Sequence, residues 1–186
     1  LCYVAQWKGQ WLALLGWGGP ALECGPRDRW IGWKPVIKWQ RISYIVNNSR
    51  FLLLPGPRIP NLASRVLALN LKRLAEDWLD TYGHEVLVAE TFVDPTRFSG
   101  SCYKGCGWLE LGKTSGWRKS GKKYIKHNRP KKIFVHPLRP DAVEVLSNPQ
   151  PHDIYQEVKP MKLSLKDAEA LMEVLLGLPD PRYARG

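Results

Sequence analysis

The feature that most constrains the fold is a long amphipathic segment between a proline-rich loop and a glycine. At helical spacing, its apolar residues are Leu62, Val66, Leu67, Leu71, Leu74, Ala75, Trp78, Leu79 and Tyr82. The preceding loop, residues 55–60, contains Pro55, Pro57 and Pro60, which exclude a regular strand or helix. We expect Asn61 to be the helix N-cap and Gly83 to end the helix. Such a helix needs an apolar layer to cover.

Strand patterns on both sides of this helix supply that layer. The expected strands cover residues 2–17 as a hairpin around Gly9, then 42–54, 86–94, 108–112 and 132–136. A short helix or turn is expected over 95–106, and Trp30–Trp33 is expected as an edge strand or a docking loop. Helices interleaved with strands predict an α/β domain, with a mixed β-sheet flanked by helices.

The C-terminal part has a different composition. Residues 138–160 are rich in proline, and 164–176 predict a last amphipathic helix. We therefore expect a domain over 1–138, then a linker and a C-terminal helical tail over 139–186. The chain begins with Leu1 inside a strand pattern, so we expect an upstream part to be missing.

Charge and short motifs restrict the function. The net charge of +11 at pH 7 favours an anionic partner. Apolar runs are too short to cross a bilayer, and no leader pattern precedes them, so the cytoplasm is the expected compartment. The four cysteines and four histidines have no metal-ligand spacing, so no metal site is expected from them.

Residues 117–132, which we call the basic run, contain no acidic residue. The expected nucleic-acid-binding residues in it are Arg118, Lys119, Lys122, Lys123, Tyr124, Lys126, Arg129, Lys131 and Lys132. Cations neutralise phosphates, and aromatic rings stack on unpaired bases. A solvated hairpin loop is the structural alternative. Nucleic acid is therefore the expected partner, with DNA and RNA not distinguished.

Other residues raise catalytic alternatives. The loop before the long helix delivers Arg58 to a helix N-terminus, where backbone N–H groups attract phosphate. Asp28, Glu90 and Asp94 would form a metal-nuclease triad if folding brought them together. The sequence contains neither a nucleophile elbow nor a P-loop, and it does not establish whether the chain is an enzyme.

Several ordered segments together resemble the DruA family of the Druantia anti-phage system, which is also met beside insertion-sequence transposases. The matching segments are Pro26–Trp33, Ile45–Pro55, Pro60–Ser64, Glu90–Asp94, and Gly100–Tyr103 with Trp108. The resemblance covers about residues 2–138. It implies a role in phage defence or mobile-element biology, with defence-system or transposase proteins as partners.

A looser resemblance concerns the fold, because the order of elements is similar to that of GNAT N-acetyltransferases. Their pyrophosphate-binding loop corresponds to residues 58–63, which makes Arg58, Asn61, Ala63 and Ser64 the candidate cofactor residues. This resemblance implies acetyl-CoA as a cofactor, with Glu90 and Tyr103 as candidate general base and acid. Asn61 stands where the family has a central glycine, and Pro60 removes an N–H donor. We therefore expect a GNAT-like scaffold that binds nucleic acid, with no cofactor.

Overall fold

The computed structural model describes residues 1–120, 123–126 and 129–149, and within 117–126 it describes the backbone alone. The described part forms one compact unit, Leu1–Pro149. This unit includes residues 139–149, which the sequence placed in a linker. The helix predicted over 164–176 lies outside the described residues.

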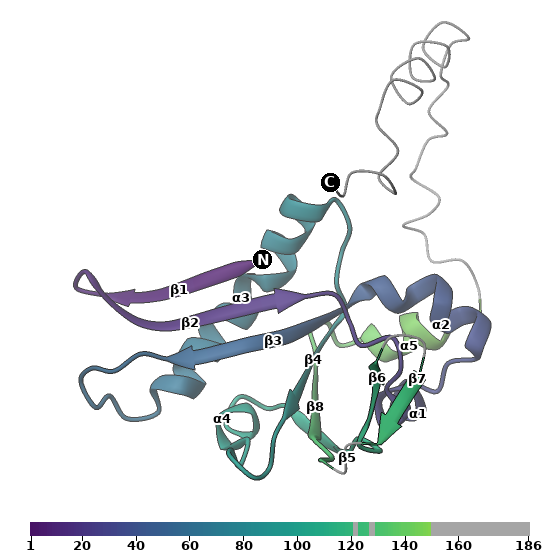
Figure 1. Cartoon of the computed structure of the whole chain (residues 1–186). Coiled ribbons are helices and arrows are strands. Elements are labelled where there is room, and N and C mark those ends of the chain that lie inside the picture. Colours follow the sequence, from purple (N-terminus) through teal and green to yellow (C-terminus); the bar gives the residue numbers. More distant parts are fainter. Residues whose placement is uncertain (121–122, 127–128, 150–186) are drawn as a thin grey trace, which may run out of the picture. The chain divides into compact units, whose positions relative to one another are not determined.

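A six-stranded mixed sheet is the centre of the domain, which confirms the predicted α/β class. Its strand order is β1-β2-β3-β4-β8-β5 (Figure 1). The strands are β1 (Cys2–Trp7), β2 (Gln10–Gly18), β3 (Ile45–Leu53), β4 (Val88–Val93), β5 (Leu109–Lys113) and β8 (Lys132–Pro137). All neighbours are antiparallel except β3 and β4.

The β1–β2 hairpin is confirmed, and its turn follows from local backbone chemistry. Lys8 and Gly9 both have positive φ, 48° and 79°. Positive φ at both central residues is the type I′ geometry, whose twist matches that of the flanking strands.

The predicted long helix is α3 (Leu62–Tyr82), which ends at Gly83 with φ 73°. It runs along one face of β1–β3 (Figure 1). Its buried residues pack with Leu15 and Trp17 of β2 and Val46 of β3 in the main core. Asn61 occupies the N-cap position but has φ 56° and makes no side-chain cap hydrogen bond, so the predicted capping role is wrong.

Three helices correct the sequence interpretation. Trp30 belongs to α1 (Gly25–Ile31), which ends at the left-handed Gly32, so residues 30–33 are not an edge strand. Helix α2 (Pro35–Arg41) was not predicted, and the segment expected as a strand from Ile42 begins with a 3₁₀ turn, η1 (Ile42–Tyr44), before β3. The proline-rich stretch after 138 includes α5 (Ala142–Ser147), whose Leu146 is fully buried. Helix α5 contacts both α1 and α2.

The parallel pairing of β3 and β4 is short. It joins only Ile45–Asn47 to Val88–Glu90, after which β3 and β4 diverge (Figure 1). The space beyond is occupied by buried side chains, including Asn48, Thr91 and Tyr103 of the short helix α4 (Ser101–Lys104).

Candidate functional site

A buried guanidinium joins two of the family-like segments. Arg27 lies on α1, and its side chain has no solvent exposure. Its Nη1 donates to Glu90 Oε2 at 2.9 Å and to the Ala21 carbonyl at 2.8 Å. Its Nε and Nη2 donate to Asp28 Oδ1 at 3.0 and 2.7 Å. Segments 26–33 and 90–94 therefore meet through Arg27 and Glu90, which are 63 residues apart in the sequence.

Glu90 lies at the middle of this network and not in an open site. Its carboxylate is fully buried and accepts the Ala21 N–H at 2.7 Å as well as Arg27. Burial raises the pKa of Glu90, and the Arg27 cation opposes that shift. Burial disfavours the Arg27 cation, but Glu90 and Asp28 outweigh it and raise the pKa of Arg27. A carboxylate enclosed on this many sides has no room for a substrate amine, so the general-base role suggested for Glu90 is not supported by the geometry.

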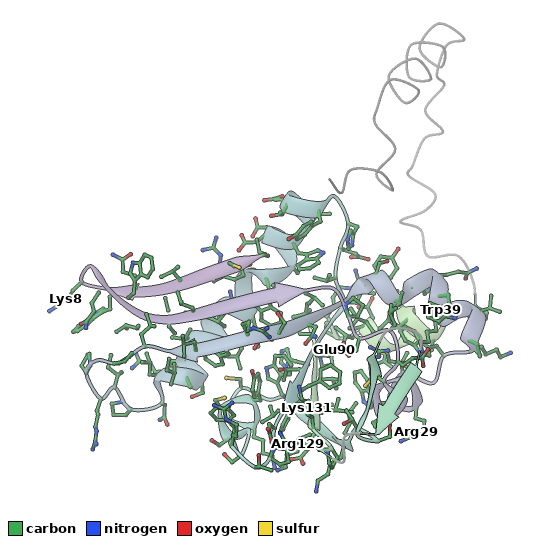
Figure 2. All side chains as sticks on the ribbon, in the orientation of Figure 1. Lys8, Arg29, Trp39, Glu90, Arg129 and Lys131 are labelled. Atoms are coloured by element: carbon green, nitrogen blue, oxygen red, sulfur yellow. The ribbon has the colours of Figure 1, made fainter. Side chains whose placement is uncertain are left out.

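The network continues to the protein surface through Lys38 of α2. Its Nζ lies 3.0 Å from Asp28 Oδ2 and 3.2 Å from Glu23 Oε2. A cavity of about 280 Å³ opens beside these groups, lined by Glu23, Asp28, Trp33, Pro35, Lys38 and Trp39. Figure 2 shows Trp39 on the side of the molecule that also carries Arg29. The chain has thus built a polar cavity with two indoles in its wall.

Tyr103 is a core residue. Its ring is stacked with Phe134 and packs edge-on against Trp108. Its hydroxyl donates to Asn48 Oδ1 at 2.8 Å, and burial raises its pKa to about 12. A hydroxyl that is buried and engaged in this way has no access to a leaving group, so the geometry gives no support to a general-acid role.

The proposed metal triad is wrong. Asp28 and Glu90 are brought together, but a cation, Arg27, already lies between them. Asp94 instead accepts the backbone N–H and hydroxyl of Thr96 at 2.9 and 2.7 Å, which lowers the pKa of Asp94. Across 1–120, 123–126 and 129–149, no three His, Cys, Asp or Glu side chains are arranged to hold a metal ion.

The loop that would bind a pyrophosphate fits it poorly. Pro60 has no N–H, and the Leu62 N–H already donates to the Ile59 carbonyl at 3.2 Å. On the other side of the helix start, the Cys106 thiol donates to the Ser64 carbonyl. Asn61 and Arg58 are exposed, whereas Ala63 and Ser64 are partly buried. The candidate cofactor residues thus form a helix start packed on the α4 turn, with two of the expected N–H donors lost.

The backbone of the basic run forms a two-stranded ribbon. β6 (Trp117–Ser120) and β7 (Lys123–Lys126) pair antiparallel, with Arg118 opposite Ile125 and Lys119 opposite Tyr124. Lys122 and the side chains of Arg118, Lys119, Lys123, Tyr124 and Lys126 lie outside what the structure describes. The ribbon connects the end of β5 to the start of β8 and is separate from the main sheet.

Further cations gather where the ribbon leaves the main sheet. We call this surface the basic end of the sheet; its cations are Arg97, Lys104, Lys113, Arg129, Lys131 and Lys132. Lys113 lies opposite Lys132 in the pairing of β5 with β8, and the charges of Arg97 and Arg129 both lower the pKa of Asp94. Arg129 and Lys131, labelled in Figure 2, are exposed. Lys132 is partly neutralised by Glu110, 3.5 Å away, which also pairs with Lys104 at 2.7 Å.

A second cavity lies elsewhere. A groove of about 650 Å³ runs between the β1–β2 hairpin and α3. Its lining is mostly apolar, with Arg65 and Arg73 as its charged residues. Arg73 is already paired with Asp77 at 2.6 Å. The groove therefore does not coincide with the ion network or with the basic end of the sheet.

Sequence reasoning missed the roles of Arg27, Lys38 and Asn48. Asn48 is buried in β3, and its Nδ2 donates to the Gly16 and Arg50 carbonyls at the irregularity between β2 and β3. The polar interruption at Asn47–Arg50 was the available signal, because an amide inside a buried strand needs partners. For Arg27 no local signal was available, because its buried partner Glu90 lies 63 residues away in the sequence.

The fold is a mixed α/β domain with a basic ribbon and a buried arginine–carboxylate network. The chain belongs to the family described as Druantia protein DruA, whose model matches residues 2–120. No curated protein matches it.

Among solved structures, the chain is similar to an aminoglycoside acetyltransferase AAC(6')-Ib in complex with coenzyme A and kanamycin, at 14% identity and a TM-score of 0.45 over 77% of this chain and 69% of that one. It is also similar to an N-acetyltransferase from Staphylococcus aureus Mu50, at 12% identity and a TM-score of 0.44 over 74% and 67%. A Drosophila melanogaster polyamine N-acetyltransferase matches at 12% identity and a TM-score of 0.42 over 73% and 74%. These likenesses concern the fold and say nothing about chemistry.

No helix within the described ranges is both long and apolar enough to span a membrane.

Proposed function

We propose that this chain is a nucleic-acid-binding domain that acts in anti-phage defence or in mobile-element biology, together with partner proteins of the same system. The defence context comes from membership of the DruA family. The binding role comes from charge, since the chain carries +11 at pH 7 and its basic run has no acid.

The observation that carries the proposal is the place of the ribbon in the fold. β6 and β7 connect β5 to β8, so the backbone of the basic run returns to the sheet at its basic end, where Arg97, Lys104 and Lys113 join Arg129, Lys131 and Lys132 of the run. The described side chains that we name at this end are six cations and two acids, Asp94 and Glu110, so the positive charges outnumber the negative ones. An excess of cations on one surface attracts a polyanion and releases its counterions.

The test is binding of a fluorescent oligonucleotide by the whole chain and by two triple variants of equal charge. In one, Lys122, Lys123 and Lys126 become alanine; in the other, Lys8, Lys34 and Lys72 do. The ribbon variant is expected to lose at least tenfold in affinity and the control less than threefold, because contact strength depends on position as well as on net charge. Equal losses in the two variants would show that the ribbon has no special role.

Acyl transfer is the alternative function that the looser resemblance implies. The enclosed Glu90, the engaged Tyr103 hydroxyl and the lost N–H donors near Pro60 all weigh against it. Calorimetric titration with acetyl-CoA at millimolar concentration is expected to give no binding heat. A saturable heat with a dissociation constant in the micromolar range would restore the acyltransferase hypothesis.

A further inference from the structure

The cavity between α1 and α2 has a chemistry that the proposed phosphate contacts do not use. It is lined by donors, acceptors and indoles, and it is adjacent to the buried Arg27 network. The charges of Arg27 and Lys38 are balanced or exceeded by those of Asp28, Glu23 and Glu90. A site without surplus positive charge is unsuited to a phosphate.

Two aromatic residues in the cavity differ in role. Trp33 is 9% exposed, and the Arg27 guanidinium lies over its ring at 5.7 Å from the centroid, which fixes the indole. Trp39 is 55% exposed, although the Lys38 ammonium approaches its ring to 5.2 Å. An indole with this much exposed surface beside a polar cavity is a stacking platform for a flat ring.

One residue that lines this cavity carries a buried donor without a hydrogen-bond partner among the described residues. Trp33 Nε1 is buried and makes no hydrogen bond within the described residues. A buried N–H that lacks an acceptor costs about 1–3 kcal/mol, so such groups are usually satisfied by a ligand or by water. The donor of Trp33 and the acceptors of Asp28 and Glu23 together match the mixed edge of a heteroaromatic base, where carboxylates accept from exocyclic amines.

We infer that this cavity holds a single unpaired nucleobase of the strand whose phosphates the basic end of the sheet and the ribbon contact; this inference rests on the proposed function. The base stacks on Trp39, and its polar edge faces Trp33, Asp28 and Glu23. The location agrees with this assignment, because α1 contacts both β5 and β8, the strands that the ribbon connects. The site is specific for single-stranded or unpaired nucleic acid, since a base within a duplex has no free face.

The experiment uses the whole chain and an oligonucleotide that carries 2-aminopurine, whose emission is quenched by stacking on indole. The variant Trp39→Ala is compared with Trp11→Ala, because Trp11 is 57% exposed and lies on β2, away from the cavity. We expect Trp39→Ala to relieve the quenching and to weaken single-strand binding roughly tenfold. Trp39→Phe is expected to recover part of the affinity, and Trp11→Ala to change little.

Binding of a fully paired duplex of the same sequence distinguishes general nucleic-acid binding from the base site at Trp39. Trp39→Ala is expected to leave duplex affinity unchanged, because duplex binding uses phosphate contacts alone. If the wild-type chain binds neither oligonucleotide, the proposed function fails. If it binds but Trp39→Ala and Trp11→Ala behave alike, or the duplex is weakened as much as the single strand, the base site is overturned and the binding function stands.

Discussion

Arg27 shows how one buried side chain can join two segments that are distant in the sequence. It has no exposed surface, and it donates four hydrogen bonds, to Glu90, to Asp28 twice and to the Ala21 carbonyl. Such a buried ion pair is stable only when both partners remain, because either charge alone is expensive to desolvate. We therefore interpret Arg27 and Glu90 as residues that fix α1 against the central strand β4.

Removing one partner of this ion pair is expected to destabilise the fold strongly. Arg27→Met leaves the buried Glu90 carboxylate without its cation and should lower the free energy of unfolding by about 3–5 kcal/mol. Urea denaturation followed by circular dichroism measures the change.

The double variant Arg27→Met with Glu90→Leu is the control, because it removes both charges together. Its loss is expected to be smaller than the sum of the two single losses by more than about 1 kcal/mol. Additive losses would mean that the two groups are not coupled.

The lowered pKa of His136 predicts that the free energy of unfolding depends on pH. Burial lowers its pKa, and the Gly107 carbonyl, 3.4 Å from Nδ1, opposes this only in part. The imidazole of His136 therefore binds a proton less readily in the folded chain than in the unfolded chain. Its contribution to the free energy of unfolding is present above about pH 6.5 and is lost as the pH falls through the folded-state pKa. A proton NMR titration should place His136 below the ordinary value, and His136→Gln should remove that part of the pH dependence. A midpoint at or above 6.5 would contradict the burial seen here.

At the scale of elements, the α4 turn is held by a close approach to the core. Gly100 has φ 81°, and a Cβ there would lie 2.5 Å from Phe134 Cζ. Gly107, at the other end of the same turn, has φ 77° but open space at the Cβ position. A comparison of alanine substitutions at the two glycines therefore distinguishes the cost of a left-handed backbone from the cost of a clash with Phe134.

Gly107→Ala is expected to cost about 1 kcal/mol through its left-handed backbone alone. Gly100→Ala is expected to cost at least about 2 kcal/mol more, because Phe134 is fully buried and has no room to move. Thermal denaturation of the two variants measures the difference. Similar melting temperatures would show that the turn can shift away from Phe134.

The elements that sequence reasoning predicted are those whose partners are local. α3 was predicted over its full length, because its apolar stripe and Gly83 are encoded in the segment itself. α1 and α2 were missed, because each spans only seven residues and is stabilised by tertiary ion pairs through Arg27 and Lys38. α5 was missed for the same reason, since its burial depends on α1 and α2.

The candidate site could be predicted only in part. The basic run was evident from composition, and its ribbon backbone agrees with a hairpin between two strands. The cavity beside α2 was not predictable, because Asp28, Trp33 and Trp39 come from separate segments that the ion pair between Lys38 and Asp28 joins. The metal triad was predicted wrongly for a related reason: the sequence shows that Asp28 and Glu90 are present, but not that the Arg27 guanidinium lies between them.

At the scale of the whole molecule, the central claim is that positive charge on one surface exists to offset an anionic polymer. The measurement that tests it most directly is the salt dependence of oligonucleotide binding by the wild-type chain and by the variant with Lys122, Lys123 and Lys126 changed to alanine. For a single strand, we expect the logarithm of the association constant to fall linearly with the logarithm of salt concentration, and the variant to reduce the slope by about two. A wild-type affinity that does not change with salt, or a slope that the variant leaves unaltered, would contradict the claim.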